Sequence, residues 1–295
     1  MVEYNTIILG SGISGMSCAI YLRRAGISTL MIEEDVPGGQ LNKISVVENY
    51  PGYPSVSGVD LAVSIFEQMN QYDIDMEYGK VIKIDYDQKI VYMDEGEYHY
   101  QYLVFATGRR ENTLGLEHEN EFIGHGISFC ATCDGALYKG QDVVVVGGGN
   151  SAVSEAIYLS NICRKVYLVY RRDNLRAENI LQEKLQKIKN IEIFSQSKVS
   201  SYLIDDGNLS GIQLDDERTI KASCVFLAVG QIPNSGLFDG EKSEQYIVVD
   251  ENFATSKRDV YACGDVIKKD VYQLITASSE GVIVANSIIK KTQNK

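Results

Sequence analysis

Two cysteines separated by two residues are the first feature of the sequence that could do chemistry. Cys130 and Cys133 are followed at once by Asp134 and a glycine, in the order Cys-Ala-Thr-Cys-Asp-Gly. This spacing fits half of a zinc site, a structural disulfide or a redox-active dithiol. The spacing alone leaves Asp134 equally open to two interpretations, a proton donor to a leaving thiolate or an ordinary solvated acid.

The rest of the sequence favours a redox dithiol. A structural zinc ion needs about four ligands, whereas the other cysteines are scattered and the chain has only 3 histidines, of which His125 lies nearest to Cys130. A disulfide across so short a loop stabilises little, and structural disulfides are rare in a reducing compartment. In C-x-x-C motifs one thiol commonly ionises near neutral pH and supplies the attacking thiolate.

Length and charge limit the class of protein. A chain of 295 residues suggests two domains at roughly 150 residues each. The net charge of −12 argues against nucleic-acid binding as the main function. No apolar run approaches the ~18 residues of a membrane span, and the first apolar run ends at Gly10, too early for a signal peptide. We therefore expect a cytoplasmic protein with neither membrane nor nucleic acid as a partner.

A strand, a glycine loop and a helix occur in the same order twice. The first set is an apolar strand over 4–9, the loop Gly10–Gly15 and a helix over 16–25. The second is a strand over 142–146, the loop Gly147–Ala152 and a helix to about residue 161. Each set is typical of a nucleotide-binding α/β unit, in which backbone amides at the helix N-terminus face phosphates.

The end of the chain returns to the first unit. Apolar strands over 103–107 and 225–229 close the two units, whereas a strand over 260–265, which ends in Gly-Asp, and a helix over 277–290 start no third unit. We therefore predict an α/β fold of two Rossmann-like (FAD/NAD(P)-binding) three-layer domains, the first discontinuous. The expected FAD-binding domain is 1–113 with 237–295, and the expected NADPH-binding domain is 114–236, which carries the cysteine pair.

The residues after the second strand of each unit distinguish the two nucleotides. Glu33 ends the strand after the first loop, where an acid binds a ribose hydroxyl. The matching strand of the second unit is followed by three arginines, at 171, 172 and 176. Guanidinium groups at this place suit the 2′-phosphate of NADPH, although a solvated basic face is the alternative. These patterns indicate FAD in the first unit and NADPH in the second.

The motifs together resemble those of a known enzyme family. They are GSGISG (10–15), PGGQL (37–41), VENYPG (47–52), FATG (105–108), CATCDG (130–135), GGGNSA (147–152), YRRDNLRAE (170–178), AVGQIPN (228–234) and CGDV (263–266). In this order the chain resembles the low-molecular-weight, bacterial-type thioredoxin reductases over essentially its whole length. The resemblance implies a homodimer that binds FAD and NADPH and reduces thioredoxin.

The resemblance also assigns site residues. It implies that Cys133 faces the flavin, that Cys130 attacks the disulfide of thioredoxin, and that Asp134 is the general acid. The implied FAD contacts are Gly10, Ser11, Gly12, Ile13, Ser14, Gly15, Glu33, Glu34, Gly39, Gln40, Leu41, Asn49, Val81, Thr107, Gly108, Asp265, Val266, Gln273 and Leu274. The implied NADPH contacts are Gly149, Asn150, Ser151, Arg171, Arg172 and Arg176.

The sequence departs from the family pattern in three places. Tyr170 stands where histidine is common before the arginines, and Ile13-Ser14 replaces Pro-Ala in the first loop. Tyr272 stands where an arginine is typical beside the flavin, so we expect a positive charge to be missing there. A ferredoxin-dependent branch of the family is similar overall, but it lacks an intact second loop and the arginines, so NADPH is favoured.

The expected reaction passes a hydride from NADPH to FAD, then electrons to the cysteine pair, then to a protein disulfide. The sequence places the cysteines and the NADPH loop in one unit and the FAD loop in the other. One flavin face cannot meet both at once, so we expect one unit to rotate during turnover. The alternatives are NADH or reduced ferredoxin as the donor, a glutaredoxin-like or peroxidase partner, a flavin-dependent NADP reductase without a disulfide step, or a redox sensor without turnover.

Overall fold

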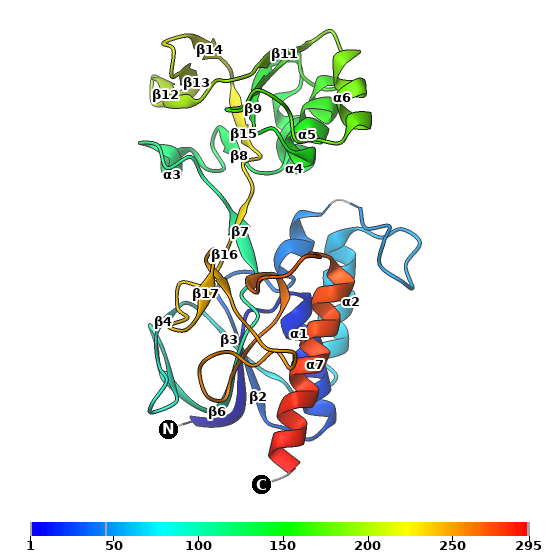
Figure 1. Cartoon of the computed structure of the whole chain (residues 1–295), viewed down its shortest axis with the longest axis vertical. Coiled ribbons are helices and arrows are strands. Elements are labelled where there is room, and N and C mark those ends of the chain that lie inside the picture. Colours follow the sequence, from blue (N-terminus) through cyan, green and yellow to red (C-terminus); the bar gives the residue numbers. More distant parts are fainter. Residues whose placement is uncertain (1, 45, 294–295) are drawn as a thin grey trace. The chain divides into compact units, whose positions relative to one another are not determined.

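The structure, a computed structural model, describes residues 2–44 and 46–293. It divides into two compact units (Figure 1), the first made of Met1–Arg110 and Ile232–Lys295 and the second of Glu111–Gln231. The first unit is therefore discontinuous in sequence. Each unit contains helices and a sheet that is parallel in the second unit and mixed in the first, as the α/β prediction allows.

The first unit is built on a seven-stranded sheet in the order β3-β2-β1-β6-β5-β4, in which β19 also pairs with β6. Its strands are β1 (Val2–Leu9), β2 (Thr29–Glu33), β3 (Asp75–Tyr78), β4 (Val81–Asp85), β5 (Ile90–Met93), β6 (Glu97–Phe105) and β19 (Val260–Ala262). In the parallel part, Ile7 of β1 lies between Leu30 of β2 and Leu103 of β6. Such strands are buried on both faces, which explains their unbroken apolar sequences.

Helices cover this sheet and bring distant segments together. They are α1 (Ile13–Arg24), α2 (Gly58–Met69), α7 (Leu274–Gln293) and the short 3₁₀ helices η1 (Gly39–Lys43) and η3 (Gly264–Val266). Figure 1 shows α1 and α7 side by side. A Cβ atom on Gly281 of α7 would lie 2.1 Å from the carbonyl oxygen of Ser14, so only glycine permits this approach. A two-stranded hairpin of β17 (Lys242–Ser243) and β18 (Tyr246–Ile247) completes the unit.

The second unit has three layers. Its central parallel sheet has the order β11-β10-β9-β15-β8. The strands are β8 (Ile127–Ser128), β9 (Asp142–Val146), β10 (Lys165–Val169), β11 (Ile191–Phe194) and β15 (Cys224–Leu227). The helices are α3 (Glu119–Phe122), α4 (Ala131–Asp134), α5 (Asn150–Ser160), α6 (Asn179–Gln186) and the 3₁₀ helix η2 (Gly135–Tyr138). An antiparallel sheet of β12 (Val199–Asp205), β13 (Asn208–Leu214) and β14 (Thr219–Lys221) packs on the other face through an apolar core.

The chain passes from one unit to the other along two paired strands. These are β7 (Arg109–Glu111) and β16 (Gln231–Pro233), which form a two-stranded ribbon. Backbone bonds from Asn112 N to Gly230 O and from Asn234 N to Gly108 O, both 2.9 Å long, close its two ends. A ribbon of only two strands is flexible compared with a packed sheet.

A buried carboxylate fixes the segment that follows this ribbon in the second unit. Glu119, 3% exposed, accepts hydrogen bonds from the backbone amides of Leu114, Gly115 and Leu116. The hydroxyl of Tyr202 in β12 donates to the same carboxylate at 2.8 Å. A buried charge needs several donors of this kind. The chain is therefore held firmly on the second-unit side of the crossing.

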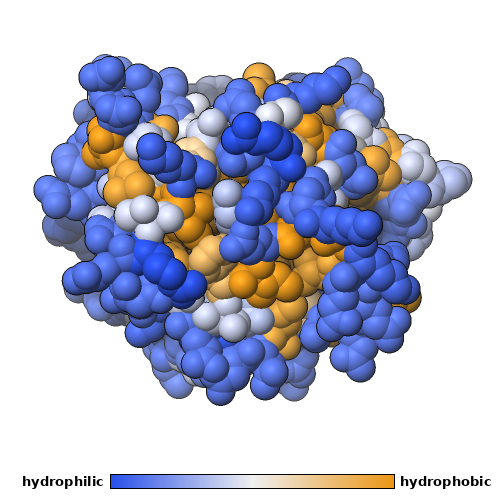
Figure 2. All heavy atoms as spheres, turned by 90° about the horizontal axis from the view of Figure 1, so that it is seen from above, coloured by the Kyte–Doolittle hydropathy of each residue, from blue (hydrophilic) through white to orange (hydrophobic). Residues whose placement is uncertain are grey.

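The surface is mainly polar. In the face that Figure 2 shows, hydrophilic residues surround smaller groups of apolar side chains. Within residues 2–44 and 46–293, no helix combines the length and hydrophobicity needed to cross a membrane.

Candidate functional site

The first glycine loop has the geometry of a phosphate cradle. Gly10 adopts a left-handed φ of +97°, and a Cβ atom on Gly15 would lie 2.1 Å from the carbonyl oxygen of Gly10, so both positions require glycine. Gly12 begins α1 without a side-chain cap, and a Cβ atom there would meet nothing within 4 Å. The open space and the uncapped amides fit a pyrophosphate group, and therefore the FAD that the sequence predicts here.

Glu33 lies at the end of β2 and reaches back to this loop. Its Oε2 accepts hydrogen bonds from the backbone N of Ser11 at 2.7 Å and from the Ser11 hydroxyl at 2.6 Å. A carboxylate has about four acceptor positions, so the group retains capacity for a ribose hydroxyl. Glu33 thus shapes the loop in addition to its predicted ribose contact.

Further hydrogen bonds gather predicted FAD residues from distant parts of the first unit. Asn49 Nδ2 donates to Gln273 Oε1 at 3.2 Å. The Gly38 amide donates to the Ser11 carbonyl at 2.9 Å, which brings the Gly39–Leu41 segment of η1 to the first loop. Thr107 and Gly108 follow β6, Asp265 and Val266 lie in η3, and Leu274 begins α7.

Two of the predicted FAD residues, Val81 and Glu34, lie next to other side chains of the first unit. Val81 is 8% exposed and belongs to the apolar core of the sheet. Glu34 is exposed, and its carboxylate lies 4.0 Å from Lys80 Nζ. The turn before Val81 approaches the end of β2, because the Gly79 amide donates to the Glu33 carbonyl at 2.9 Å.

Tyr272 itself carries no charge where an arginine is typical, but two positively charged side chains lie next to its ring. The guanidinium carbon of Arg109 lies 4.1 Å from the centroid of the Tyr272 ring, and Arg109 Nη2 lies 2.7 Å from Asp265 Oδ2. The Lys269 ammonium lies 5.3 Å from the same ring centroid. Comparison with the family pattern considers only the residue type at position 272. The two cations come from elsewhere in the chain, Arg109 from β7 and Lys269 from the segment after η3.

The second glycine loop repeats the cradle in the second unit. Gly147 has a φ of +146°, and Gly149 begins α5 without a side-chain cap and with no atom within 4 Å of an added Cβ. Ser151 lies in the first turn of this helix. Asn150 Nδ2 donates to Glu178 Oε1 at 3.1 Å, and Glu178 N donates to Asn150 Oδ1 at 2.8 Å. The loop is therefore tied to the segment that carries the three arginines.

The three arginines are placed for a negatively charged ligand. The Arg176 amide donates to the Gly148 carbonyl at 2.7 Å, so the segment lies directly beside the loop. The side chains of Arg171, Arg172 and Arg176 are exposed. No ion pair within the described chain occupies their guanidinium groups. This geometry fits the 2′-phosphate of NADPH next to a pyrophosphate on the loop.

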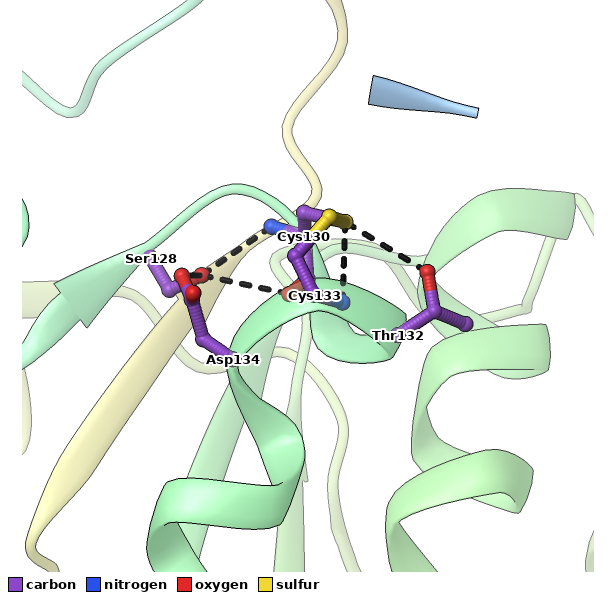
Figure 3. The surroundings of a disulfide bond; sticks show 5 residues. All are labelled: Ser128, Cys130, Thr132, Cys133 and Asp134. Carbon is purple, nitrogen blue, oxygen red and sulfur yellow. Dashed lines mark hydrogen bonds between the residues drawn. A yellow bond between two sulfur atoms is a disulfide. The ribbon is translucent and has the colours of Figure 1, made fainter. Parts of the chain in front are cut away.

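The cysteine pair forms a disulfide (Figure 3), with Cys130 and Cys133 at the start of the short helix α4. The backbone N of Cys133 donates to Cys130 Sγ at 3.2 Å, and Thr132 Oγ1 lies 3.4 Å from the same sulfur. Cys133 is exposed and Cys130 is partly exposed. After reduction, a thiolate at Cys130 would keep the amide donor, which favours its ionised form.

Ser128 is a site residue that the sequence interpretation missed. Its Oγ donates to Asp134 Oδ2 at 2.6 Å and accepts from the backbone N of Cys130 at 3.1 Å. Figure 3 shows Ser128 and Asp134 on one side of the disulfide and Thr132 on the other. A serine two residues before the first cysteine was the available signal. One hydroxyl thus joins the acid to the backbone of the first cysteine.

Replacing Ser128 by alanine should lower kcat/KM for the disulfide substrate by up to roughly tenfold, because Asp134 loses the hydrogen bond that orients it and such a bond contributes about 0.5–1.5 kcal/mol. Flavin reduction by NADPH should stay unchanged, and Ser128→Thr should restore much of the rate. Ser160→Ala is the control, since that hydroxyl bonds only to the Ile157 carbonyl of its own helix. An unchanged kcat/KM in Ser128→Ala would refute the role.

Glu155 is a half-buried acid on the helix that follows the second loop. It lies on α5, and its Oε2 is buried without a hydrogen-bond partner in the described chain. Burial raises its pKa from the ordinary 4.5 to about 7. Because the folded state favours the protonated form, the contribution to stability is greatest below pH 4.5 and is lost as the pH rises through about 7.

Glu155→Gln should therefore flatten the pH dependence of unfolding. At pH near 8 the variant is expected to be more stable than the parent by about 1–3 kcal/mol, since one pKa unit corresponds to about 1.4 kcal/mol. Near pH 5 the difference should shrink. Urea unfolding at both values measures it, with the exposed Glu183→Gln as control. An equal difference in unfolding free energy between variant and parent at pH 5 and at pH 8 would contradict the prediction.

The chain is similar to known proteins over nearly its whole length. The family model described as "Pyridine nucleotide-disulphide oxidoreductase" matches residues 4–281. A thioredoxin reductase of Bacillus subtilis is 36% identical over 97% of this chain and 93% of that protein. A thioredoxin reductase of Mycoplasma genitalium is 38% identical over 95% of this chain and 93% of that protein. The crystal structure of a Lactococcus lactis thioredoxin reductase is 31% identical and matches with a TM-score of 0.87 over 99% of this chain and 100% of that one.

Proposed function

The chain belongs to the pyridine nucleotide-disulphide oxidoreductase family, and we propose that it is an FAD-containing thioredoxin reductase that uses NADPH. Electrons pass from NADPH through FAD to the Cys130–Cys133 disulfide and then to oxidised thioredoxin. The observation that carries the proposal is the Cys130–Cys133 disulfide in the unit that also holds the second glycine loop, with Ser128 linking Asp134 to the backbone N of Cys130.

The first unit holds FAD. The amides at the start of α1 bind its pyrophosphate, and Glu33 binds the adenosine ribose. The remaining contacts come from η1, the turn after β6, η3 and the start of α7, which hydrogen bonds and short turns bring to the same part of the unit. When bound, FAD accepts a hydride and passes two electrons onward.

The second unit holds NADPH. Gly149, Asn150 and Ser151 at the start of α5 bind the pyrophosphate, and Arg171, Arg172 and Arg176 bind the 2′-phosphate. Tyr170 leaves this arrangement intact, since its amide donates to the Phe194 carbonyl at 3.0 Å as part of the sheet edge.

The cysteines exchange electrons with the protein substrate. After two electrons break the Cys130–Cys133 bond, the thiolate of Cys130 attacks one sulfur of the thioredoxin disulfide and releases the other as a thiolate. Cys133 then attacks Cys130, which re-forms the internal disulfide and releases dithiol thioredoxin. Asp134, held by Ser128, supplies a proton to a departing sulfur.

Turnover requires the two units to change their arrangement, because NADPH and the disulfide belong to one unit and FAD to the other. The paired strands β7 and β16 are the hinge that we propose, because the chain crosses between the two units along them. A reversible covalent cross-link between the units should abolish multiple turnover, and cutting the link should restore it. Undiminished turnover in the cross-linked protein would exclude the rotation.

The protein acts in the cytoplasm as a homodimer. Sedimentation of the FAD-loaded protein tests the dimer, which a single monomeric species would exclude.

Coupled assays test the function itself. We expect thioredoxin reduction with NADPH to exceed the rate with NADH or reduced ferredoxin by at least roughly a hundredfold, since the phosphate contacts add several charge-assisted bonds. A glutaredoxin-like protein in place of thioredoxin is the matched acceptor control. Equal or greater activity with another donor or acceptor would favour the alternative partners.

A further inference from the structure

We propose that Arg109 binds the riboflavin half of FAD, and that its guanidinium donates a hydrogen bond to the cofactor and favours its reduced form. The proposal rests on the proposed use of FAD by the first unit. Arg109 is the first residue of β7 and follows directly after the Thr107–Gly108 turn. It was absent from the residues that the sequence indicated.

The Arg109 side chain is fixed by neighbours on two sides. Its Nη2 donates to Asp265 Oδ2 at 2.7 Å, and its guanidinium carbon lies 4.1 Å from the centre of the Tyr272 ring. Its carbonyl oxygen accepts from Gln40 Nε2 at 2.8 Å, which fixes the backbone as well. A planar guanidinium held by a carboxylate and an aromatic ring has one defined orientation.

One donor of this ordered group has no acceptor. The Nε atom of Arg109 is buried and has no hydrogen-bond partner within the described residues. Leaving a buried charged donor without an acceptor destabilises a folded protein, so a ligand that supplies the acceptor is favoured. The side chain as a whole is 18% exposed, so it is accessible to a ligand.

The surroundings indicate which ligand. Gln40, Asp265 and Gly108, all proposed FAD residues, contact Arg109 or adjoin it in sequence, and Gln273 follows its aromatic partner Tyr272. The glycine loop and Glu33 are assigned to the pyrophosphate and the adenosine ribose. The oxygen and nitrogen acceptors of the ribityl chain and flavin ring therefore remain for this part of the site.

The charge of Arg109 should favour reduced FAD. Hydride transfer converts NADPH and FAD into NADP⁺ and FADH⁻, so the flavin gains one negative charge. The nearby Lys269 is already engaged, with its Nζ 2.9 Å from both Glu280 oxygens and 3.4 Å from Asp265 Oδ1. Arg109 is thus the cation of this cluster with a donor still available. A charge beside the flavin is a recognised means of tuning its potential.

Two substitutions separate hydrogen bonding from charge. Arg109→Gln removes both, so we expect FAD to bind at least tenfold more weakly and the midpoint potential to become more negative by about 30 mV, the equivalent of a tenfold preference in a two-electron couple. Arg109→Lys keeps the charge and the pairing with Asp265 but lacks Nε. It should show the weaker FAD binding with a potential close to that of the parent.

The control is Arg110→Gln, the adjacent and exposed arginine whose Nη1 donates to Asn234 Oδ1 at 2.9 Å. Fluorescence titration of the apoprotein with FAD and spectroelectrochemistry of the holoprotein give both quantities without thioredoxin. Tyr272→Leu, which removes the stacking partner, should shift both in the same direction as Arg109→Gln. FAD affinity and potential in Arg109→Gln equal to those of Arg110→Gln would overturn the proposal. Failure of the parent itself to bind FAD would instead overturn the proposed function.

Discussion

Replacing Cys133 by serine is expected to reduce NADPH-dependent thioredoxin reduction by roughly 10³-fold or more, because the relay then lacks one of its two sulfurs. The disulfide seen between Cys130 and Cys133 cannot form in this variant. Flavin reduction by NADPH should persist, because that step uses neither cysteine. The variant should therefore bleach its flavin with NADPH and then fail to transfer the electrons to thioredoxin.

Two further variants complete this prediction. Cys130→Ser should also abolish turnover, and only Cys133→Ser should retain the thiol that attacks thioredoxin, so only it should form a stable mixed disulfide. Cys163→Ser is the matched control, since Cys163 is a buried free cysteine of the same unit. Full activity of Cys133→Ser would show that electrons leave the flavin by another route and would favour an NADP reductase without a disulfide step.

Replacing Arg171 and Arg172 together by glutamine should raise the KM for NADPH about a hundredfold or more, since each charge-assisted bond to phosphate contributes about 1.5–3 kcal/mol. Both residues are exposed, on the segment whose Arg176 amide donates to the Gly148 carbonyl of the second glycine loop. The kcat/KM for NADH, which lacks the 2′-phosphate, should change by less than about twofold, because the variant removes only phosphate contacts. Steady-state kinetics with both nucleotides measure the change in preference.

Arg164→Gln is the control for this prediction. Arg164 belongs to the same unit, and its Nε lies 2.7 Å from Asp142 Oδ1, so its charge is already paired. It should leave the preference for NADPH intact. Equal losses with NADPH and NADH in the Arg171/Arg172 variant would mean that the arginines support the fold or form a solvated basic face.

The strand, loop and helix order could be predicted because it depends on short-range chemistry. A loop such as Gly10–Gly15 needs glycine at fixed spacing, and a strand buried on both faces needs a continuous apolar run such as Val143–Val146. The helix at the end of the chain and the return of β19 to the first sheet follow from the same patterns. The antiparallel sheet β12–β14 was missed, since its strands are partly exposed and polar residues interrupt their apolar pattern.

The parts of the site that were missed depend on contacts between distant residues. Arg109 meets Asp265 across 156 positions of sequence, and no local pattern reports such a pair. Ser128 lies only two residues before Cys130 in the sequence. Its role depends on a hydrogen bond to Asp134, which forms because the turn of α4 brings the two side chains together. Motif comparison identifies residue types, whereas orientation and partners come from the fold.

The most direct test of the electron path is stopped-flow spectroscopy of the FAD-loaded protein, mixed first with NADPH and then with oxidised thioredoxin. NADPH should bleach the flavin absorbance, NADH should do so far more slowly, and thioredoxin should restore the absorbance as its own disulfide is reduced. The same sequence with Cys133→Ser should stop after bleaching. A bleached flavin that thioredoxin leaves unchanged in the parent protein would contradict the assignment of Cys130–Cys133 as the relay.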